Sequence, residues 1–370
     1  MAQRLLGNLS PSSFLRFHWQ KRPLFVRNAV PQCGTWLQRE TLFDLACRDD
    51  VESRIVTRSG GRWRVAHGPF TQNRLRRMPA RNWTLLVQGV EQFLPDAAAL
   101  LQQFSFIPHA RLDDLMVSYA APGGGVGPHF DSYDVFLLQG AGARRWRISA
   151  QKDLTLVDNA PLRILKNFRP RQTWDVATGD LLYLPPRYAH DGVASTACMT
   201  LSVGFRTPRK LELASNFLDF LQDNLEIDGM IEDAGLPLQA HPAQLPPFLI
   251  DRFLRVLKGV RWTEADVRRF AGAYLTEPKP RVVFARPRRA LTLENFTRRL
   301  MKGGIRLALP TRMLYEGKHV FINGECHPLE YAHRGVLIQL ADTRAAPGFE
   351  PDAATARRVY AWYCAGYVDV

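Results

Sequence analysis

The sequence predicts an α+β protein in which a β-rich sandwich or barrel is followed by helices and then by a small mixed module. Three observations support this order. Short β-prone runs bounded by glycine and proline fill residues 1–208, the apolar period becomes helical over 209–276, and a helix, strand and hairpin pattern fills 277–370. Since 370 residues are too many for one ordinary core, we expect separate domains with these boundaries.

The first region consists of short runs with high β propensity. Turn residues separate them, a spacing typical of a sandwich or barrel. Two helical patterns, near Ser12–Trp19 and Leu37–Cys47, are expected to pack on the outside of the β structure. The clearest β-prone runs are Ser53–Thr57, Trp83–Val87, Leu115–Tyr119, Val135–Leu138, Arg144–Ile148 and Met199–Val203.

The middle region carries apolar residues at helical spacing. Thr263 and Asp266 give the last of its expected helices a start that resembles a capping box. The apolar faces need a partner, which is either the β-rich part or, in a homodimer, the same region of a second chain. The residues on the three faces are Leu211, Ala214, Leu218 and Leu221; Ile250, Phe253, Leu254 and Leu257; and Val267, Phe270 and Tyr274.

The last region has the element order of a winged-helix-like module. A helix over Thr292–Lys302 precedes a strand over Ile305–Leu309, a hairpin turning near Glu316-Gly317, and helices near Leu329–Leu340 and Ala353–Tyr363. A helix of this kind usually presents its charges to solvent, so direct nucleic-acid binding is not expected. The basic residues that would make such a contact are Arg298, Arg299, Lys302 and Arg306.

Charge, hydropathy and cysteine usage limit the class of protein. A formal net charge of +14 fits polyanionic surroundings such as RNA or ribosomes, and an arginine-rich composition alone would explain it equally well. The chain lacks an apolar run of about 18 residues that would cross a membrane. The N-terminus lacks the apolar core of a signal peptide, and the five cysteines are scattered without C-x-x-C spacing. We therefore expect reduced thiols and a cytoplasmic protein.

Two short stretches have the pattern of one metal site. The first contains His129 and Asp131, and the second ends in His190. Side chains two apart on a strand point the same way, so His129 and Asp131 can reach one ion. Two imidazoles and one carboxylate occupy one face of an octahedral ion and leave the opposite positions open, as in non-heme Fe(II) oxygenases.

A cupin of the four-ligand type would differ at this site. It has a second histidine in place of Asp131 and a glutamate a few residues later, where this chain has Val135 and Phe136. The missing fourth ligand favours the open coordination that catalysis needs. The second stretch resembles the second cupin motif with Arg187 at the usual glycine, which is a turn residue and not a ligand.

An iron site of this type needs a cosubstrate that supplies two electrons, and the commonest is 2-oxoglutarate. Its distal carboxylate needs a cation. Arg144 shares the expected buried face of its strand with Trp146 and Ile148, and a buried guanidinium requires an anionic partner. Arg206 is the rival, because some oxygenases place their arginine there. Hydroxyl groups that could assist are those of Ser118, Thr200 and Ser202.

Several segments resemble the bacterial JmjC-type (cupin) ribosomal oxygenases. The glycine loop together with H-x-D is the most specific combination, and the resemblance covers nearly the whole chain. The segments are Lys21–Arg27, Pro122–Phe136, Arg144–Arg147, Leu182–Pro186, Ser202–Arg206 and Arg298–Gly304.

The resemblance implies a double-stranded β-helix, or jelly roll, followed by a helical dimerisation region and a C-terminal winged helix. It implies a homodimer that hydroxylates an arginine side chain of a large-subunit ribosomal protein with Fe(II) and 2-oxoglutarate. The residues carried over are His129, Asp131 and His190 for iron, and Ser118 and Arg144 for 2-oxoglutarate.

An arginine substrate is a cation and needs an acceptor close to the metal. Asp114 and Tyr133 are the candidates for this role, followed by Asp134. Because the whole chain is basic, these groups must supply a local negative potential within a positive molecule.

Two functions from other classes also fit parts of the sequence. One is a transcription regulator, in which a ligand-sensing cupin is joined to a winged-helix nucleic-acid-binding domain. The other is a metal-dependent isomerase or storage-type cupin, which the missing fourth ligand disfavours. Succinate formation that depends on iron and 2-oxoglutarate would distinguish the oxygenase from both.

Overall fold

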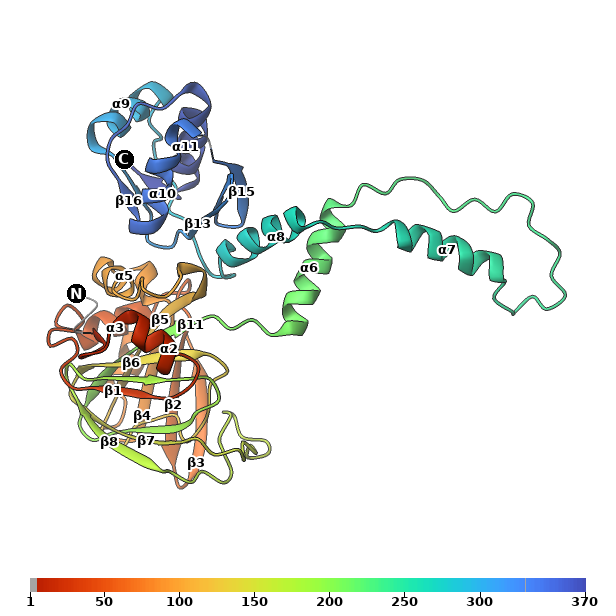
Figure 1. The fold of residues 1–370 in the computed structure, drawn as a ribbon. Helices are drawn as coiled ribbons and strands as arrows, with labels where there is room; N and C mark the ends of the chain where they lie inside the picture. The colour runs from red at the N-terminus through yellow and green to blue at the C-terminus, as the bar shows by residue number, and fades with distance from the viewer. Residues whose placement is uncertain (1–4, 330) are drawn as a thin grey trace.

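The computed structural model describes residues 5–329 and 331–370. The β-rich first half forms one body, the C-terminal residues form a second body beside it, and a helical arm projects from between them (Figure 1). The order of jelly roll, helical region and winged helix confirms the predicted α+β fold class.

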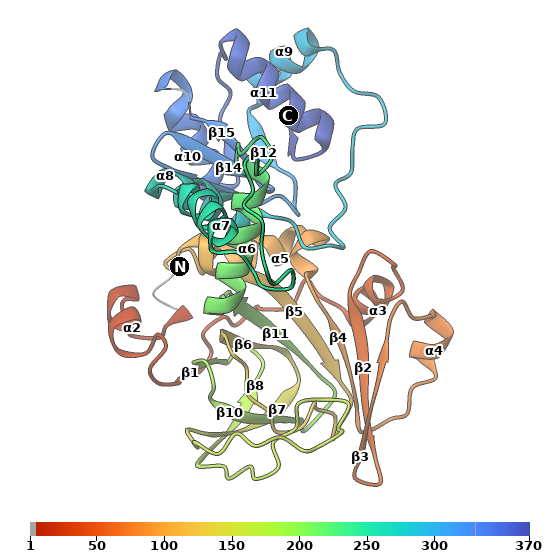
Figure 2. The same cartoon turned by 90° about the vertical axis from the view of Figure 1, so that its right-hand side faces the viewer.

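Two antiparallel sheets form the jelly roll (Figure 2). The larger sheet has the strand order β1-β9-β6-β11-β5-β4-β2-β3, and the smaller has the order β10-β7-β8. All six predicted runs lie within strands. The bounds are β1 (Leu24–Val26), β2 (Ser53–Ser59), β3 (Arg62–His67), β4 (Trp83–Val87), β5 (Leu112–Ala120), β6 (Asp134–Ala141), β7 (Ala143–Ser149), β8 (Gln172–Ala177), β9 (Leu181–Leu184), β10 (Ala189–Ala194) and β11 (Cys198–Phe205).

Side-chain alternation gives the larger sheet two different faces. On β5, Leu115 and Val117 are buried in the hydrophobic core on the helix-covered face. Met116 and Ser118 point the other way and line a cavity between the sheets. On this strand the period therefore turns Ser118 toward the cavity, while Leu115 and Val117 pack under the helices.

Short helices and turns cover the outer face of the larger sheet. The rings of Phe14 and Phe104 lie 5.4 and 5.0 Å from the ring of Phe136 on β6. The predicted early helices are therefore correct in position and in the face that they cover. The elements are α2 (Pro11–Phe17), α3 (Arg39–Ala46), α4 (Gln72–Arg76), α5 (Pro95–Gln102), and the 3-10 turns η1 (Val90–Gln92) and η2 (His109–Arg111).

The middle region consists of α6 (Lys210–Asn224), α7 (Pro247–Gly259) and α8 (Glu264–Thr276). Thr263 and Asp266 form the expected capping box at the start of α8. The rings of Phe217 on α6 and Phe270 on α8 lie 5.2 Å apart, so these helices pack together. Helix α7 lies far out on the arm, away from both bodies (Figure 1).

The C-terminal body has its own core, which includes Phe296, Leu300 and Trp362. Its hairpin turns at Gly317, which has a φ of 57° and follows Glu316 as expected. The elements are α9 (Leu293–Gly303), β12 (Ile305–Leu307), β13 (Met313–Glu316), β14 (His319–Ile322), β15 (Glu325–Pro328), η3 (Tyr331–His333), α10 (Arg334–Thr343), β16 (Ala345–Ala346), α11 (Ala353–Ala365) and β17 (Val368–Asp369).

The helix expected near Leu329–Leu340 begins later than predicted, at Arg334, because β15 extends to Pro328 and η3 follows it. Residue 330, which falls within the expected helix, lies outside the described residues.

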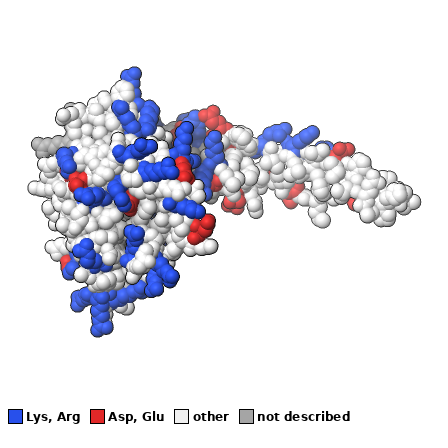
Figure 3. Space-filling view, turned by 90° about the horizontal axis from the view of Figure 1, so that it is seen from below, with Lys and Arg blue, Asp and Glu red and all other residues white. Residues whose placement is uncertain are grey.

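The surface is basic over a wide area. Figure 3 shows lysine and arginine side chains spread over the globular part and along the arm, with fewer acidic side chains between them. Within residues 5–329 and 331–370, no helix combines the length and hydropathy required to cross a membrane.

Candidate active site

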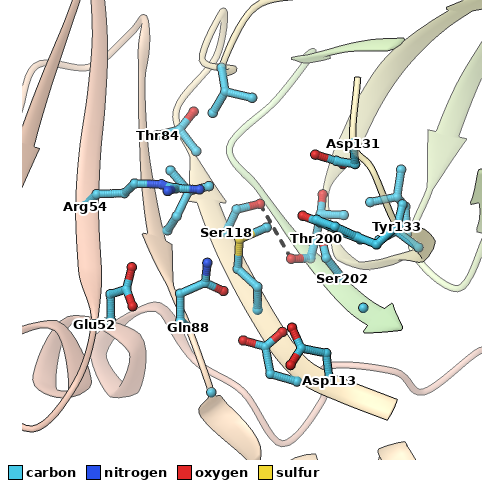
Figure 4. A pocket seen from close by; sticks show the side chains of 18 of the residues that line it. Glu52, Arg54, Thr84, Gln88, Asp113, Ser118, Asp131, Tyr133, Thr200 and Ser202 are labelled. Carbon is cyan, nitrogen blue, oxygen red and sulfur yellow. Dashed lines mark hydrogen bonds between the residues drawn. The ribbon is translucent and has the colours of Figure 1, made fainter. Parts of the chain in front are cut away.

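A cavity of about 460 Å³ lies between the two sheets. The larger sheet contributes Asp114, Met116, Ser118, Thr200 and Ser202 to its wall. Figure 4 shows Tyr133 and Asp131 across from Arg54, with Ser118 and Thr200 between them. The remaining polar lining residues include His129, His190, Arg144, Thr84, Gln88 and Lys279.

His129, Asp131 and His190 meet at one side of this cavity. One possible ligand atom from each lies within 4.8 Å of the other two. The Oδ2 atom of Asp131 is 4.0 Å from Nε2 of His129 and 3.6 Å from Nε2 of His190. These separations suit donors arranged around one transition-metal ion. Among the described residues this is the group of histidine, cysteine and acidic side chains that could hold a metal.

The hydrogen bonds of both imidazoles fix their orientation. Nδ1 of His129 lies 2.8 Å from the carbonyl oxygen of Gly127, and Nδ1 of His190 lies 2.8 Å from that of Tyr188. A carbonyl oxygen can only accept, so each Nδ1 donates and each Nε2 keeps a lone pair for a metal. Burial lowers the pKa of His190 to about 4, with the nearby His129 adding to the effect. The imidazole is therefore neutral at physiological pH, as metal binding requires.

Backbone pairing brings the two distant stretches together. The amide of His129 donates to the carbonyl of His190 at 2.9 Å, and the reverse bond is 2.8 Å. The amide of Arg187 donates to the carbonyl of Asp131 at 2.6 Å. Arg187 has a φ of 63°, in the left-handed region that favours glycine, which explains why glycine is usual at this place in the motif.

Arg144 on β7 is buried at the cavity wall, as strand parity predicts. Arg145 and Arg147 on the opposite face pair with Asp175 and Asp191. The Nε atom of Arg144 is buried without a hydrogen-bond partner, and the described residues offer its guanidinium no carboxylate. A buried cation without a counterion is costly, so this position fits an anionic ligand such as the distal carboxylate of 2-oxoglutarate.

Hydroxyl groups line the wall of the larger sheet. Ser118 on β5 lies opposite Thr200 on β11, and its Oγ donates to the Thr200 carbonyl at 3.5 Å (Figure 4). Thr200 in turn donates to Oε1 of Gln139 at 3.1 Å. Ser202 lies further along β11 and also lines the cavity. All three hydroxyls that the sequence suggested therefore face the space between the sheets.

Two residues weighed from the sequence lie outside the cavity. Arg206 is paired with Asp113, with 3.4 Å between Nε and Oδ1, so it already has a counterion. Asp134 is fully buried on the helix-covered face of β6, where the hydroxyl of Tyr183 donates to it at 2.6 Å. The suggestion that Asp134 could receive a substrate cation is therefore wrong, because strand alternation turns it away from the metal ligands.

Asp114 and Tyr133 both line the cavity. Burial raises the pKa of the Tyr133 hydroxyl, and the charge of Asp131 adds to this, so the group stays protonated. Asp114 is not vacant: its Oδ2 atom lies 3.4 Å from Nζ of Lys279.

Sequence reasoning missed several lining residues. Arg54 on β2 reaches into the cavity, and its Nε is buried without a partner, as is Oγ1 of Thr84 on β4 (Figure 4). Alternation along β2 could have indicated Arg54, because Arg54 shares a face of the strand with the buried Val56. Lys279 follows a proline in an irregular segment, so its sequence carries no signal of its position.

Two known domain families match the sequence. One is a JmjC domain over residues 99–213, and the other is a ROXA-like winged helix over residues 259–367. The ribosomal protein uL16 3-hydroxylase of Escherichia coli K12 is 33% identical over 336 residues, which cover 90% of this chain and 88% of that protein. A probable ribosomal oxygenase of Haemophilus influenzae is 39% identical over 63% of this chain and 58% of its own length.

Solved structures of Escherichia coli YcfD have the same architecture. The X-ray structure of YcfD gives a TM-score of 0.86 at 31% identity and covers 98% of both chains. A structure of YcfD, described as a ribosomal oxygenase in complex with cobalt and 2-oxoglutarate, gives a TM-score of 0.82 at 32% identity, again over 98% of both chains.

Proposed function

Since this chain belongs to the JmjC-type ribosomal oxygenases, we propose that it hydroxylates an arginine side chain of a large-subunit ribosomal protein with Fe(II) and 2-oxoglutarate. The Escherichia coli relative is named for hydroxylation of uL16, which makes uL16 the first substrate to test. The supporting observation is that an open set of three metal ligands shares one cavity with a buried arginine for which the described residues supply no counterion.

The proposed roles follow from where each group lies. Fe(II) together with 2-oxoglutarate supplies the activation of O₂ that hydroxylation of an unactivated carbon requires. His129, Asp131 and His190 would hold the ion from one side, and Arg144 would bind the distal carboxylate through its planar fork. Ser118 would add a hydroxyl contact to the same carboxylate.

The substrate end of the cavity would bind the guanidinium. Asp114 is the acceptor for its charge, and Tyr133 offers a hydroxyl and a ring face beside it. Tyr133 is 39% exposed, so its ring can contact an incoming peptide while the metal ligands stay deeper. Holding the reacting carbon at a fixed distance and excluding water are the contributions of the protein to the reaction.

The proposal is tested on ribosomal proteins from cells with and without the gene for this chain. We expect one large-subunit protein, with uL16 the first candidate, to carry the mass of one additional oxygen atom only when the gene is present. Peptide fragmentation should place that oxygen on an arginine. Ribosomal proteins of identical mass in both strains would contradict the proposal.

Arg144→Ala should raise the KM for 2-oxoglutarate about tenfold to a hundredfold, because a charge-assisted bidentate contact is lost. Arg145→Ala is the matched control, since it removes an arginine from the opposite face of the same strand and should leave this KM within about twofold. Both constants come from succinate formation at varied 2-oxoglutarate. A larger effect of Arg206→Ala would assign the carboxylate to the rival arginine.

The arm offers a surface for a second copy of the chain. Phe253, Leu254 and Leu257 on α7 are 44%, 44% and 65% exposed, although they share an apolar face of the helix. We propose that this face is covered in a homodimer. Light scattering should then give twice the chain mass of 42.0 kDa. Leu257→Asp should give the mass of a monomer. Lys258→Asp, at the exposed neighbouring residue, is the control and should keep the mass of a dimer.

The alternative of a ligand-sensing transcription regulator is disfavoured. The winged helix that motivated it belongs to the ROXA-like type, and the relatives that match over most of the chain are ribosomal oxygenases.

A further inference from the structure

The segment that follows α8 lies against the cavity. It leads from the helical arm to the C-terminal body, and three of its residues, Lys279, Arg281 and Val282, line the wall. The active site is therefore completed by a part of the chain that lies outside the jelly roll.

Lys279 lies between the two neighbouring acids at the start of β5. Its Nζ is 3.0 Å from Oδ1 of Asp113 and 3.4 Å from Oδ2 of Asp114. The side chain of Asp114 is only 12% exposed, so a contact with it is shielded from water. The carboxylate that we propose for the substrate guanidinium thus already has a cationic partner within the same chain.

The ion pair favours the charged form of both partners. Burial raises the pKa of Asp114, and the charge of Lys279 opposes that effect. Burial alone would lower the pKa of Lys279, but the carboxylates of Asp114 and Asp113 outweigh it and raise the pKa. A guanidinium that takes the place of Lys279 brings the same positive charge, so the exchange keeps the Asp114 carboxylate paired with a cation.

The two acids differ in what else they contact. Asp113 is also paired with Arg206 at 3.4 Å and lies 3.9 Å from Arg312 of the C-terminal body. For Asp114, the described part of the chain provides no cation at ion-pair distance besides Lys279. Lys279 could therefore leave Asp114 and keep its closer contact with Asp113, so its ammonium would not be left buried without a partner.

We propose that Lys279 is an intramolecular stand-in for the substrate cation, which the incoming arginine displaces from Asp114 onto Asp113. This inference rests on the proposed function. An arginine can win the exchange, because a guanidinium forms two parallel hydrogen bonds with a carboxylate whereas an ammonium acts as a point charge. The free energy needed to move Lys279 off Asp114 is the same for every cationic ligand. A side chain that binds Asp114 only weakly therefore does not displace Lys279.

The test is the KM for an arginine-containing uL16 peptide in the full-length, iron-loaded enzyme. Lys279→Met removes the competing charge and keeps much of the chain length, so it should lower this KM roughly tenfold. The KM for 2-oxoglutarate and the bound iron should stay within about twofold, since Lys279 contacts neither Arg144 nor the metal ligands. An unchanged or increased peptide KM would overturn the proposal.

Two further variants distinguish displacement from a general effect of charge. Arg289→Met removes an exposed cation from the same segment that neither lines the cavity nor pairs with Asp113 or Asp114, so it should change the peptide KM less than about twofold. A gain equal to that of Lys279→Met would overturn the proposal. Lys279→Arg should instead raise the KM, because its fork holds the acids more firmly; an unchanged or lower KM would overturn it.

Failure of the proposed function would be recognised separately. If the wild-type enzyme does not hydroxylate the peptide, the arginine substrate is wrong. The inference is then decided by binding of N-acetyl-arginine methylamide, measured by calorimetry on the wild type and on Lys279→Met. Tighter binding to the variant supports a displaced stand-in, and equal or weaker binding overturns it.

Discussion

His129→Ala and Asp131→Ala should each abolish 2-oxoglutarate turnover while leaving the protein folded. Each substitution removes one of the three donors that can surround an ion, and the described residues near them include no fourth ligand that could take its place. Loss of a metal ligand typically costs orders of magnitude in activity, so we expect less than about 1% of wild-type succinate formation. Bound iron measured by atomic absorption should fall in parallel.

The fold should survive because both side chains lie at the cavity wall. They are 21% and 24% exposed, so their truncation removes little buried surface. His190 is a poorer choice for the same test, since it is 3% exposed and its ring lies 5.8 Å from that of Trp146. His241→Ala, in an exposed loop, is the matched control. Near-normal turnover by a folded His129 or Asp131 variant would refute the metal site.

The strand period explains why the jelly roll and most of the candidate site could be predicted from the sequence. Alternation on β7 places Arg144 inside and Arg145 outside, and both positions are as expected. His129 and Asp131 are two positions apart, so their common orientation follows from local geometry alone. Their approach to His190 was predicted from the chemistry of the ligand set, which needs a second imidazole, since no local rule pairs residues so far apart in the chain.

Contacts made across domains could not be predicted in this way. Lys279 lies in an irregular segment, and its position against Asp113 and Asp114 depends on how the C-terminal body is fixed to the jelly roll. Arg312 of that body donates to the carbonyl of Leu112 at 3.1 Å and to that of Asp113. The sequence gives the charge of each group, but tertiary packing decides which charges meet.

The C-terminal body therefore influences the candidate site without carrying any of its metal ligands. Through Arg312 it holds the start of β5, the strand that presents Asp114 to the cavity. Glu91, whose Oε2 accepts from the amide of Leu115, is a second buried acid beside Asp114, and burial raises its pKa to about 7. The charges around Asp114, the proposed substrate acceptor, thus form a network shared between both bodies.

Asp114→Asn should suppress hydroxylation of an arginine peptide at least thirtyfold, because leaving one partner of a buried charge pair alone costs about 2 kcal/mol or more. Iron content and the KM for 2-oxoglutarate should stay close to wild type, since the carboxylate belongs to neither ligand set. Peptide mass and succinate are measured in the same reaction. Asp175→Asn, at an exposed carboxylate that pairs with Arg145, is the control and should have no effect.

The chemistry of the substrate gives a second measure of the same contact. A peptide with lysine in place of the arginine should be hydroxylated poorly by the wild type, because an ammonium cannot reproduce the planar fork that pairs with Asp114. In Asp114→Asn the difference between the two peptides should largely disappear, since the carboxylate that distinguishes them is gone. Equal hydroxylation of both peptides by the wild type would refute arginine recognition by Asp114 and would leave the metal and 2-oxoglutarate assignments standing.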